Sequence, residues 1–195
     1  MTLDIFDWMV ENYIELIGSC LGIIYVLLAS RQNIWCWLIG ILSCGLYIMV
    51  FFIEKLYGDM SLQVFYLIMG IYGWILWHSK RNNSEEIKIH YIKLFQFIYL
   101  LVFIFISTVG FGYILSLTED PIPYWDGFTN ALGLAGTWMT ARKYIENWLL
   151  WIFANIVCAA IYYYKGLYPT VVFYLIMSLL ALRGYYLWKK EIIKI

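Results

Sequence analysis

Long, uninterrupted apolar runs separated by short polar segments extend along the whole chain. A helix needs about 20 predominantly apolar residues to cross the hydrocarbon core of a bilayer. Strict alternation of apolar and polar residues, the pattern of outer-membrane strands, is absent from these runs. The pattern therefore predicts seven transmembrane helices, over residues 14–30, 34–53, 60–78, 94–117, 125–141, 146–164 and 169–188.

The few prolines favour unbroken helices. The chain has three, of which Pro121 and Pro123 are expected in the loop before the fifth helix. Pro169 is expected in the first turn of the seventh helix, where proline is tolerated. The predicted fold class is therefore an all-α integral membrane protein.

The composition supports this fold class. Hydrophobic residues make up 64% of the chain and charged residues 13%, whereas soluble domains carry about a quarter charged residues. This excludes a soluble globular domain, a disordered chain and a nucleic-acid-binding module. The four cysteines show neither CxxC nor Cys/His spacing, so we interpret them as small buried residues rather than disulfides or ligands.

Basic residues are distributed unequally between the two sides that seven crossings define. One side holds Lys55 and Lys165, and Arg183 lies within the last helix. Because cytoplasmic loops carry the excess of Lys and Arg, we expect the N-terminus outside and the C-terminus in the cytoplasm. The ten basic residues of the cytoplasmic side are Arg31, Lys80, Arg81, Lys88, Lys93, Arg142, Lys143, Lys189, Lys190 and Lys194.

The two halves of the chain resemble each other at an offset of 111 residues, and residues 64–69 match 172–177 at an offset of 108. We interpret residues 14–78 and 125–188 as three-helix repeats in parallel orientation. Residues 94–117 then form the linking helix that restores the orientation. Such 3+1+3 repeats are a transporter architecture, with the substrate site near the midplane between the halves. The matched pairs include Arg31 with Arg142, Trp37 with Trp148, Gly73 with Gly184, and Trp77 with Trp188.

Motifs for catalysis are missing from the sequence. It lacks a glycine-rich phosphate loop, a metalloprotease motif and a serine-hydrolase motif, so we expect no catalytic residue, no metal and no cofactor. The membrane charges Glu15, Asp126 and Arg183 lie near helix ends, where snorkelling accounts for them. A passive facilitator is therefore favoured over an ion-coupled carrier.

Neutral polar and aromatic side chains inside the predicted helices are candidates for substrate contacts. Residues four apart share a helix face, so Asn147, Trp151 and Asn155 are expected to form one wall of a cavity. An amide that faces lipid is costly, so these residues should face a partner helix or a cavity. The alternative is that they only form interhelical hydrogen bonds. The full candidate set is Gln63, Tyr66, Asn130, Trp138, Asn147, Trp148, Trp151, Asn155 and Tyr174.

Residues 137–151 contain an arginine-lysine pair followed by Glu-Asn-Trp-x-x-Trp, at Arg142, Lys143 and 146–151. This segment resembles the PnuC family of bacterial vitamin transporters. The resemblance implies a 3+1+3 fold like that of full-length SWEET sugar transporters, often as a homotrimer. It implies facilitated diffusion of nicotinamide riboside across the bacterial inner membrane, for NAD biosynthesis, with trapping by cytoplasmic phosphorylation.

Other functions remain open at this point. Relatives with the same motifs carry thiamine or other vitamins, so the motif indicates the family rather than the cargo. A SWEET-type sugar transporter has prolines in the first two helices of each repeat, and this chain has none there. A membrane enzyme or an assembly subunit predicts a charged or metal-binding cluster at one membrane face, which the sequence does not contain.

Overall fold

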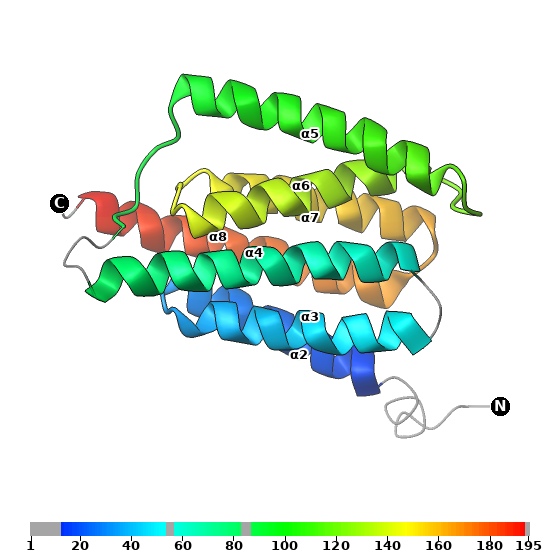
Figure 1. Cartoon of the computed structure of the whole chain (residues 1–195), viewed down its shortest axis with the longest axis horizontal. Helices are drawn as coiled ribbons and strands as arrows, with labels where there is room; N and C mark the ends of the chain where they lie inside the picture. The colour runs from blue at the N-terminus through cyan, green and yellow to red at the C-terminus, as the bar shows by residue number, and fades with distance from the viewer. Residues whose placement is uncertain (1–12, 54–56, 83–86, 194–195) are drawn as a thin grey trace.

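The computed structural model describes residues 13–53, 57–82 and 87–193, which form a bundle of seven helices (Figure 1). The prediction of seven helices is confirmed. Lys55 and Lys194, and the side chains of Glu15, Lys80 and Arg81, lie outside the described part of the chain. The helices are α2 (Tyr13–Ser30), α3 (Trp35–Ile53), α4 (Tyr57–Asn82), α5 (Leu94–Leu115), α6 (Pro123–Ala141), α7 (Asn147–Tyr164) and α8 (Tyr168–Ile193).

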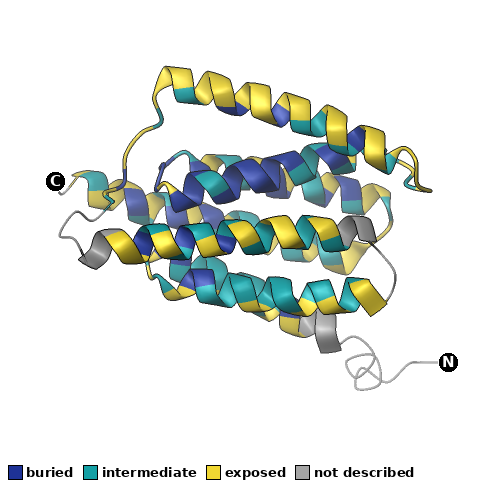
Figure 2. Cartoon of the chain, in the orientation of Figure 1, coloured by how far each residue is buried: buried dark blue, intermediate teal, exposed yellow. Residues whose placement is uncertain are grey.

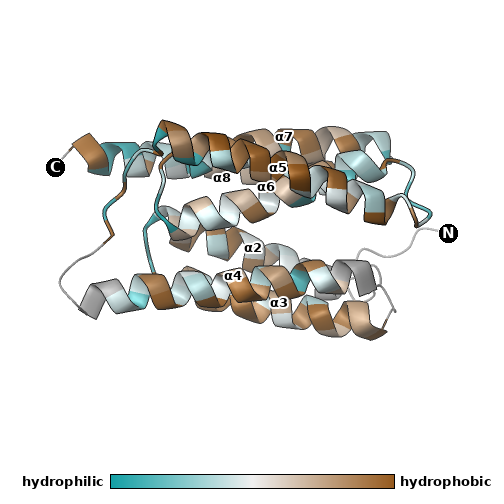
Figure 3. Cartoon of the chain, turned by 45° about the horizontal axis from the view of Figure 1, so that its top comes forward, coloured by the Kyte–Doolittle hydropathy of each residue, from teal (hydrophilic) through white to brown (hydrophobic). Residues whose placement is uncertain are grey.

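Five helices are long and apolar enough to cross a membrane, among the residues that the structure describes. The apolar part of α2, Ile17–Ser30, is shorter. Helix α6 is paler in hydropathy than α5 because it is rich in glycine, alanine and threonine (Figure 3). That α2 and α6 also cross the membrane therefore stays a prediction. The five spans are Trp35–Ile53, Met60–Ser79, Leu94–Leu115, Asn147–Tyr164 and Tyr168–Ile193.

The helices alternate in direction, so that α2 begins at one end of the bundle and α8 finishes at the other (Figure 1). Helix α3 packs on α4, and α7 packs on α8. Across the middle of the bundle, α2 contacts α8 and α4 contacts α6. Helix α5 packs on α6 and leaves most of its surface exposed, whereas α6 is the most buried helix (Figure 2). Small side chains in α6 allow neighbouring helices to approach closely.

Two tryptophan pairs lie at the end of the bundle where α8 finishes. We call it the basic end, because Arg31, Lys88, Lys93, Arg142, Lys143, Lys189 and Lys190 lie near it. Trp37 of α3 meets Trp77 of α4 edge to face, with ring centroids 5.5 Å apart at 89°. Trp148 of α7 meets Trp188 of α8 at 5.3 Å and 88°. All four side chains are buried, so these pairs fill the core at the basic end.

The turns beside these pairs also match. Gln32 follows α2 and Lys143 follows α6, and both adopt a left-handed backbone, with φ of 53° and 57°. The Lys143 Nζ donates a hydrogen bond to the Gln32 Oε1 at 2.8 Å and lies 4.7 Å from the ring centroid of Trp77. Gly73 and Gly184 make room for the first ring of each pair, since a Cβ there would lie 2.5–2.6 Å from Trp37 or Trp148.

Several expectations need correction. Pro123 is the first residue of α6 rather than part of the preceding loop, because a first-turn proline needs no hydrogen-bonded N–H. Helix α4 extends to Asn82 and α8 to Ile193, because helical hydrogen bonding continues beyond the apolar run into charged residues. The four cysteines are free, but only Cys36 is buried as predicted; Cys44 and Cys158 are half-buried and Cys20 is exposed.

Candidate functional site

A cavity of about 420 Å³ lies between α4, α6, α7 and α8, and we call it the central cavity. Its lining begins at the end opposite to the basic end, with Asp120 and Lys165 from the loops. It reaches Tyr66 in the third turn of α4 and Trp151 in the second turn of α7. The volume falls in the range of small-molecule binding sites. The cavity therefore extends from one end of the bundle to its interior.

Five of the nine predicted site residues line the central cavity. They come from four helices and are Tyr66, Asn130, Trp151, Asn155 and Tyr174. The side-chain amides of Asn130 and Asn155 make no hydrogen bond with any residue that the structure describes. Asn155 is 6% exposed. The amide atoms of both residues keep contact with the open space of the cavity, so they are available to a ligand.

Aromatic side chains form other parts of the lining. Tyr162 and Tyr174 stack with ring centroids 5.3 Å apart at 18°. The Trp151 Nε1 donates to the Thr140 Oγ1 at 3.3 Å, which fixes the orientation of the indole. Gly136 of α6 lies under this indole, because a Cβ there would lie 2.8 Å from its Cε2 atom. The rings provide flat apolar surfaces on which a planar ligand can stack.

Charged residues stand where the cavity meets the opposite end of the bundle. The Lys165 Nζ lies 2.5 Å from the Asp126 Oδ2 and 4.0 Å from the Asp120 Oδ1. Burial lowers the pKa of Lys165, but its hydrogen bond to Asp126 and the charge of the two carboxylates outweigh this and raise the pKa above 10.5. Two carboxylates and one ammonium give this entrance a net negative charge, which favours cationic ligands.

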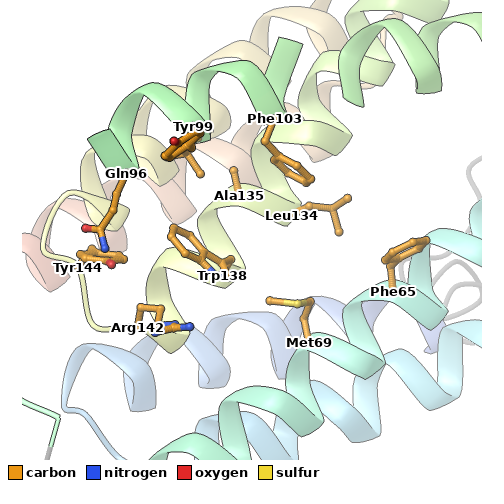
Figure 4. A pocket seen from close by; sticks show the side chains of 11 residues that line it. Phe65, Met69, Gln96, Tyr99, Phe103, Leu134, Ala135, Trp138, Arg142 and Tyr144 are labelled. Carbon is orange, nitrogen blue, oxygen red and sulfur yellow. The ribbon is translucent and has the colours of Figure 1, made fainter. Parts of the chain in front are cut away.

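The structure places the other four predicted residues elsewhere. Gln63 is half-buried in α4 and does not line the central cavity. Trp138 faces an apolar groove between α4, α5 and α6 (Figure 4). Asn147 is fully buried, donates to the backbone carbonyl three residues earlier at 2.5 Å and accepts from Thr140 at 3.3 Å. Trp148 belongs to the second tryptophan pair.

The sequence did not point to several lining residues. Asp126 and Lys165 lie at the same end of the neighbouring helices α6 and α7, so their opposite charges were a usable signal. Three consecutive tyrosines begin at Tyr162, and the sequence alone does not show which of them faces the cavity. The two that follow Tyr162 are exposed. Thr129 and Cys158 also line the cavity, and no pattern in the sequence separates them from other small residues.

A smaller chamber of about 180 Å³ adjoins the central cavity and shares Tyr66 and Trp151 with it. Its other walls include Tyr25, Gly40 and Trp37, all from the first half of the chain. Trp37 belongs to the first tryptophan pair, which fills the core at the basic end. The smaller chamber thus adjoins the central cavity on one side and the first tryptophan pair on the other.

Comparison with known proteins identifies the family. The sequence model of the family described as "Nicotinamide mononucleotide transporter" matches residues 12–190. The chain belongs to this family. It is 28% identical to the nicotinamide riboside transporter PnuC of Escherichia coli, over 91% of this chain and 85% of that protein. It is 25% identical to the riboflavin/roseoflavin transporter RibM of Streptomyces davaonensis, over 89% and 83%.

A solved structure also resembles this chain. It is the crystal structure of the vitamin B3 transporter PnuC, with a TM-score of 0.75 and 22% identity, covering 97% of this chain and 86% of that one. The shared fold confirms a helical architecture of the PnuC type. Membership of the family makes the protein a multi-pass membrane transporter and not an enzyme.

Proposed function

We propose that this protein imports nicotinamide riboside by facilitated diffusion and that the central cavity binds it. Nicotinamide riboside combines a flat cationic pyridinium ring, a carboxamide and ribose hydroxyls. The observation that carries the proposal is the set of two unpartnered amides, Asn130 and Asn155, beside stacked aromatic rings in one cavity. Curated relatives named as nicotinamide riboside transporters support the choice of cargo.

Each part of the ligand has a chemical counterpart in the lining. The tyrosine stack and the Trp151 indole offer faces for the pyridinium ring, and a cation over an aromatic face gains about 0.5–2 kcal/mol. The amides of Asn130 and Asn155 can bond the carboxamide and the ribose hydroxyls. Asp120 and Asp126 favour approach of the positive ring from the opposite end. We therefore propose Tyr66, Asn130, Trp151, Asn155 and Tyr174 as the binding residues, while contacts from Gln63, Trp138, Asn147 and Trp148 stay a prediction.

We further propose the SWEET-like 3+1+3 repeat, with residues 14–78 and 125–188 as the halves and 94–117 as the linking helix. Equivalent geometry supports it: both halves contain a perpendicular tryptophan pair and a glycine under the first ring. The contacts of α4 with α6 and of α2 with α8 are those that a two-fold relation between the halves predicts. The bond between Lys143 and Gln32 joins two positions that are exactly one repeat apart.

The orientation proposed for the protein has the basic end in the cytoplasm, because cytoplasmic loops are rich in Lys and Arg. The central cavity then opens toward the outside, and the tryptophan pairs lie on the cytoplasmic side of it. Phosphorylation by a cytoplasmic kinase would keep the imported riboside inside. A homotrimer in the bacterial inner membrane, which the family resemblance implies, is part of the same proposal.

Binding to the purified protein tests the proposed cargo. The detergent-solubilised protein is titrated in parallel with nicotinamide riboside, thiamine and riboflavin, and tryptophan fluorescence is recorded. Binding of nicotinamide riboside that is lost in Asn155→Ala, which keeps every tryptophan reporter, supports the proposal. Tight binding of another vitamin alone would keep the fold and change the cargo. Reconstitution into vesicles then separates passive uptake, which ceases at equal concentrations, from uptake driven by an ion gradient.

Riboflavin is the second candidate. The specific observation in its favour is the similarity to a riboflavin/roseoflavin transporter over 89% of the chain. Riboflavin carries a large uncharged ring, so the carboxylates at the cavity entrance would not assist its approach. An Asp126→Asn substitution therefore distinguishes the two cargoes, because it should weaken binding of a cation and leave binding of a neutral ring nearly unchanged.

A further inference from the structure

An apolar groove of about 530 Å³ lies between α4, α5 and α6, away from the central cavity (Figure 4). We call it the α5 groove. Phe65 and Met69 of α4 form one wall, Phe103 of α5 forms another, and Leu134 and Trp138 of α6 lie between them. Helix α5 links the two halves, so the groove has no counterpart in the first half of the chain.

The α5 groove becomes polar at the basic end. Gln96, Arg142 and Tyr144 line this end of the groove, and the apolar residues lie farther along it (Figure 4). The same three residues also line an adjoining cavity of about 410 Å³, together with Lys93 and His90. We call this second cavity the basic pocket. An apolar space thus continues directly into a space that Lys93 and Arg142 line.

No acidic side chain lines the basic pocket among the residues that the structure describes. Within the same residues, the α5 groove is not lined by an aspartate or glutamate either. The guanidinium of Arg142 makes no hydrogen bond or ion pair with any residue in the described ranges. Its neighbour Lys143 turns instead to Gln32 and Trp77. Arg142 is therefore the part of the arginine-lysine motif that remains available to an external anion.

We propose that the α5 groove and the basic pocket together bind one anionic phospholipid, with an acyl chain in the groove and the phosphate at Arg142. Basic pockets between transmembrane helices on the cytoplasmic side bind anionic headgroups. Arg142 directly follows α6 and is eight residues from Leu134, about 12 Å along the helix axis. One leaflet of the hydrocarbon core is about 15 Å thick, so the groove matches most of one acyl chain.

The surrounding residues fit a lipid better than a soluble anion. Tyr99, Trp138 and Tyr144 stand at the junction of the groove and the pocket, and tyrosine and tryptophan are enriched at the level of the headgroups. A free phosphate ion would use the basic pocket and leave the groove unoccupied. A second copy of the chain would use the groove without needing the basic charge. The continuity of the two spaces selects a ligand with an acyl chain and a negative headgroup.

Brominated lipids test the proposal, because bromine quenches the fluorescence of a tryptophan that it contacts. The full chain is reconstituted in phosphatidylcholine vesicles that contain increasing fractions of phosphatidylglycerol brominated near the headgroup. The contribution of Trp138 is the difference between the wild type and Trp138→Phe. We expect a preference for brominated phosphatidylglycerol over brominated phosphatidylcholine of about 25-fold, because Arg142 and Lys93 each contribute about fivefold near an anionic lipid.

Two variants and one control decide the outcome. Arg142→Gln should lower the preference about fivefold. Lys93→Gln should lower it by a similar factor, which provides a second measurement if the first variant folds poorly. Arg31→Gln is the matched control, because Arg31 is the repeat equivalent of Arg142, is exposed at the basic end and lines neither space. Equal quenching by both lipids, an unchanged preference in Arg142→Gln, or an unquenched Trp138 would each overturn the proposal.

Discussion

Asn147 and Asn155 lie two turns apart on α7, and their amides differ in what they bond. Asn147 is fully buried and bonded on both sides, at 2.5 Å to a backbone carbonyl and at 3.3 Å from Thr140. Asn155 faces the central cavity and makes no hydrogen bond with any described residue. Leucine resembles asparagine in shape and lacks the amide. Asn→Leu at each position therefore tests hydrogen bonding with little change in volume.

The expected effects are opposite. Asn147→Leu removes two buried hydrogen bonds, so it should lower the free energy of unfolding by about 1–3 kcal/mol. Asn155→Leu removes an amide without a partner in the protein, so the unfolding free energy should stay the same or rise. Asn155→Leu instead removes a bonding group from the ligand. We expect this to weaken binding of nicotinamide riboside by about 1–3 kcal/mol, which is about five- to 150-fold in Kd.

Thermal unfolding of the ligand-free protein and a fluorescence titration with nicotinamide riboside measure these two quantities on the same samples. The matched pair separates a folding defect from a binding defect, since each variant is the control for the other. Wild-type affinity in Asn155→Leu would refute the assignment of this amide to the binding site. A loss of stability in Asn155→Leu as large as that in Asn147→Leu would show that both amides are structural.

Three further expectations concern the entrance, the packing and the basic end. Because its pKa is raised in the folded protein, Lys165 stabilises the fold fully at pH values below its ordinary pKa of 10.5. This stabilisation is lost as the pH rises through the higher pKa of the folded protein. Lys165→Met should lack this alkaline loss of stability in thermal unfolding. Gly184→Ala places a methyl group against the Trp148 ring and should lower the free energy of unfolding by about 1–3 kcal/mol. At Gly45 a methyl group would meet no atom within 4 Å, so Gly45→Ala should be tolerated in the same thermal unfolding assay. Gln32→Leu removes two hydrogen bonds that join the two halves, those with Lys143 and Glu191. The buried thiol of Cys36 should therefore react faster with a maleimide than in the unsubstituted protein, with the other cysteines replaced in both; an equal rate would show that these bonds do not hold the end closed.

The helices were predictable from the sequence because length and hydropathy decide them. Helix α5 begins at Leu94, directly after Lys93, the last charged residue of the preceding loop. The sequence pattern and the structure agree on this position. The ends of α4 and α8 were less predictable. Helical hydrogen bonds do not require an apolar side chain, so both helices continue through charged residues to Asn82 and Ile193.

The candidate site was only partly predictable, because spacing along a helix does not say which neighbour a face meets. Asn130 and Trp138 are eight residues apart on α6, a rotation of about 80° beyond two full turns. This rotation turns Trp138 away from the cavity and toward α5. Asn147 was assigned to the same wall as Asn155, but it is the first residue of α7 and bonds the turn before it. No pattern in the sequence indicates where that turn ends.

The tight packing of the tryptophans at the basic end has an energetic cost. The indole Nε1 of Trp77 donates to the backbone carbonyl of Ala141 at 2.9 Å, but those of Trp37, Trp148 and Trp188 are buried without a partner among the described residues. Each such donor costs about 1–3 kcal/mol relative to a hydrated one. If the pairs separated, water would hydrate these donors. The free energy of hydration would offset part of the packing energy lost on separation. A carrier needs its closed and open ends to differ by only a few kcal/mol, and unpartnered donors in both tryptophan pairs reduce that difference.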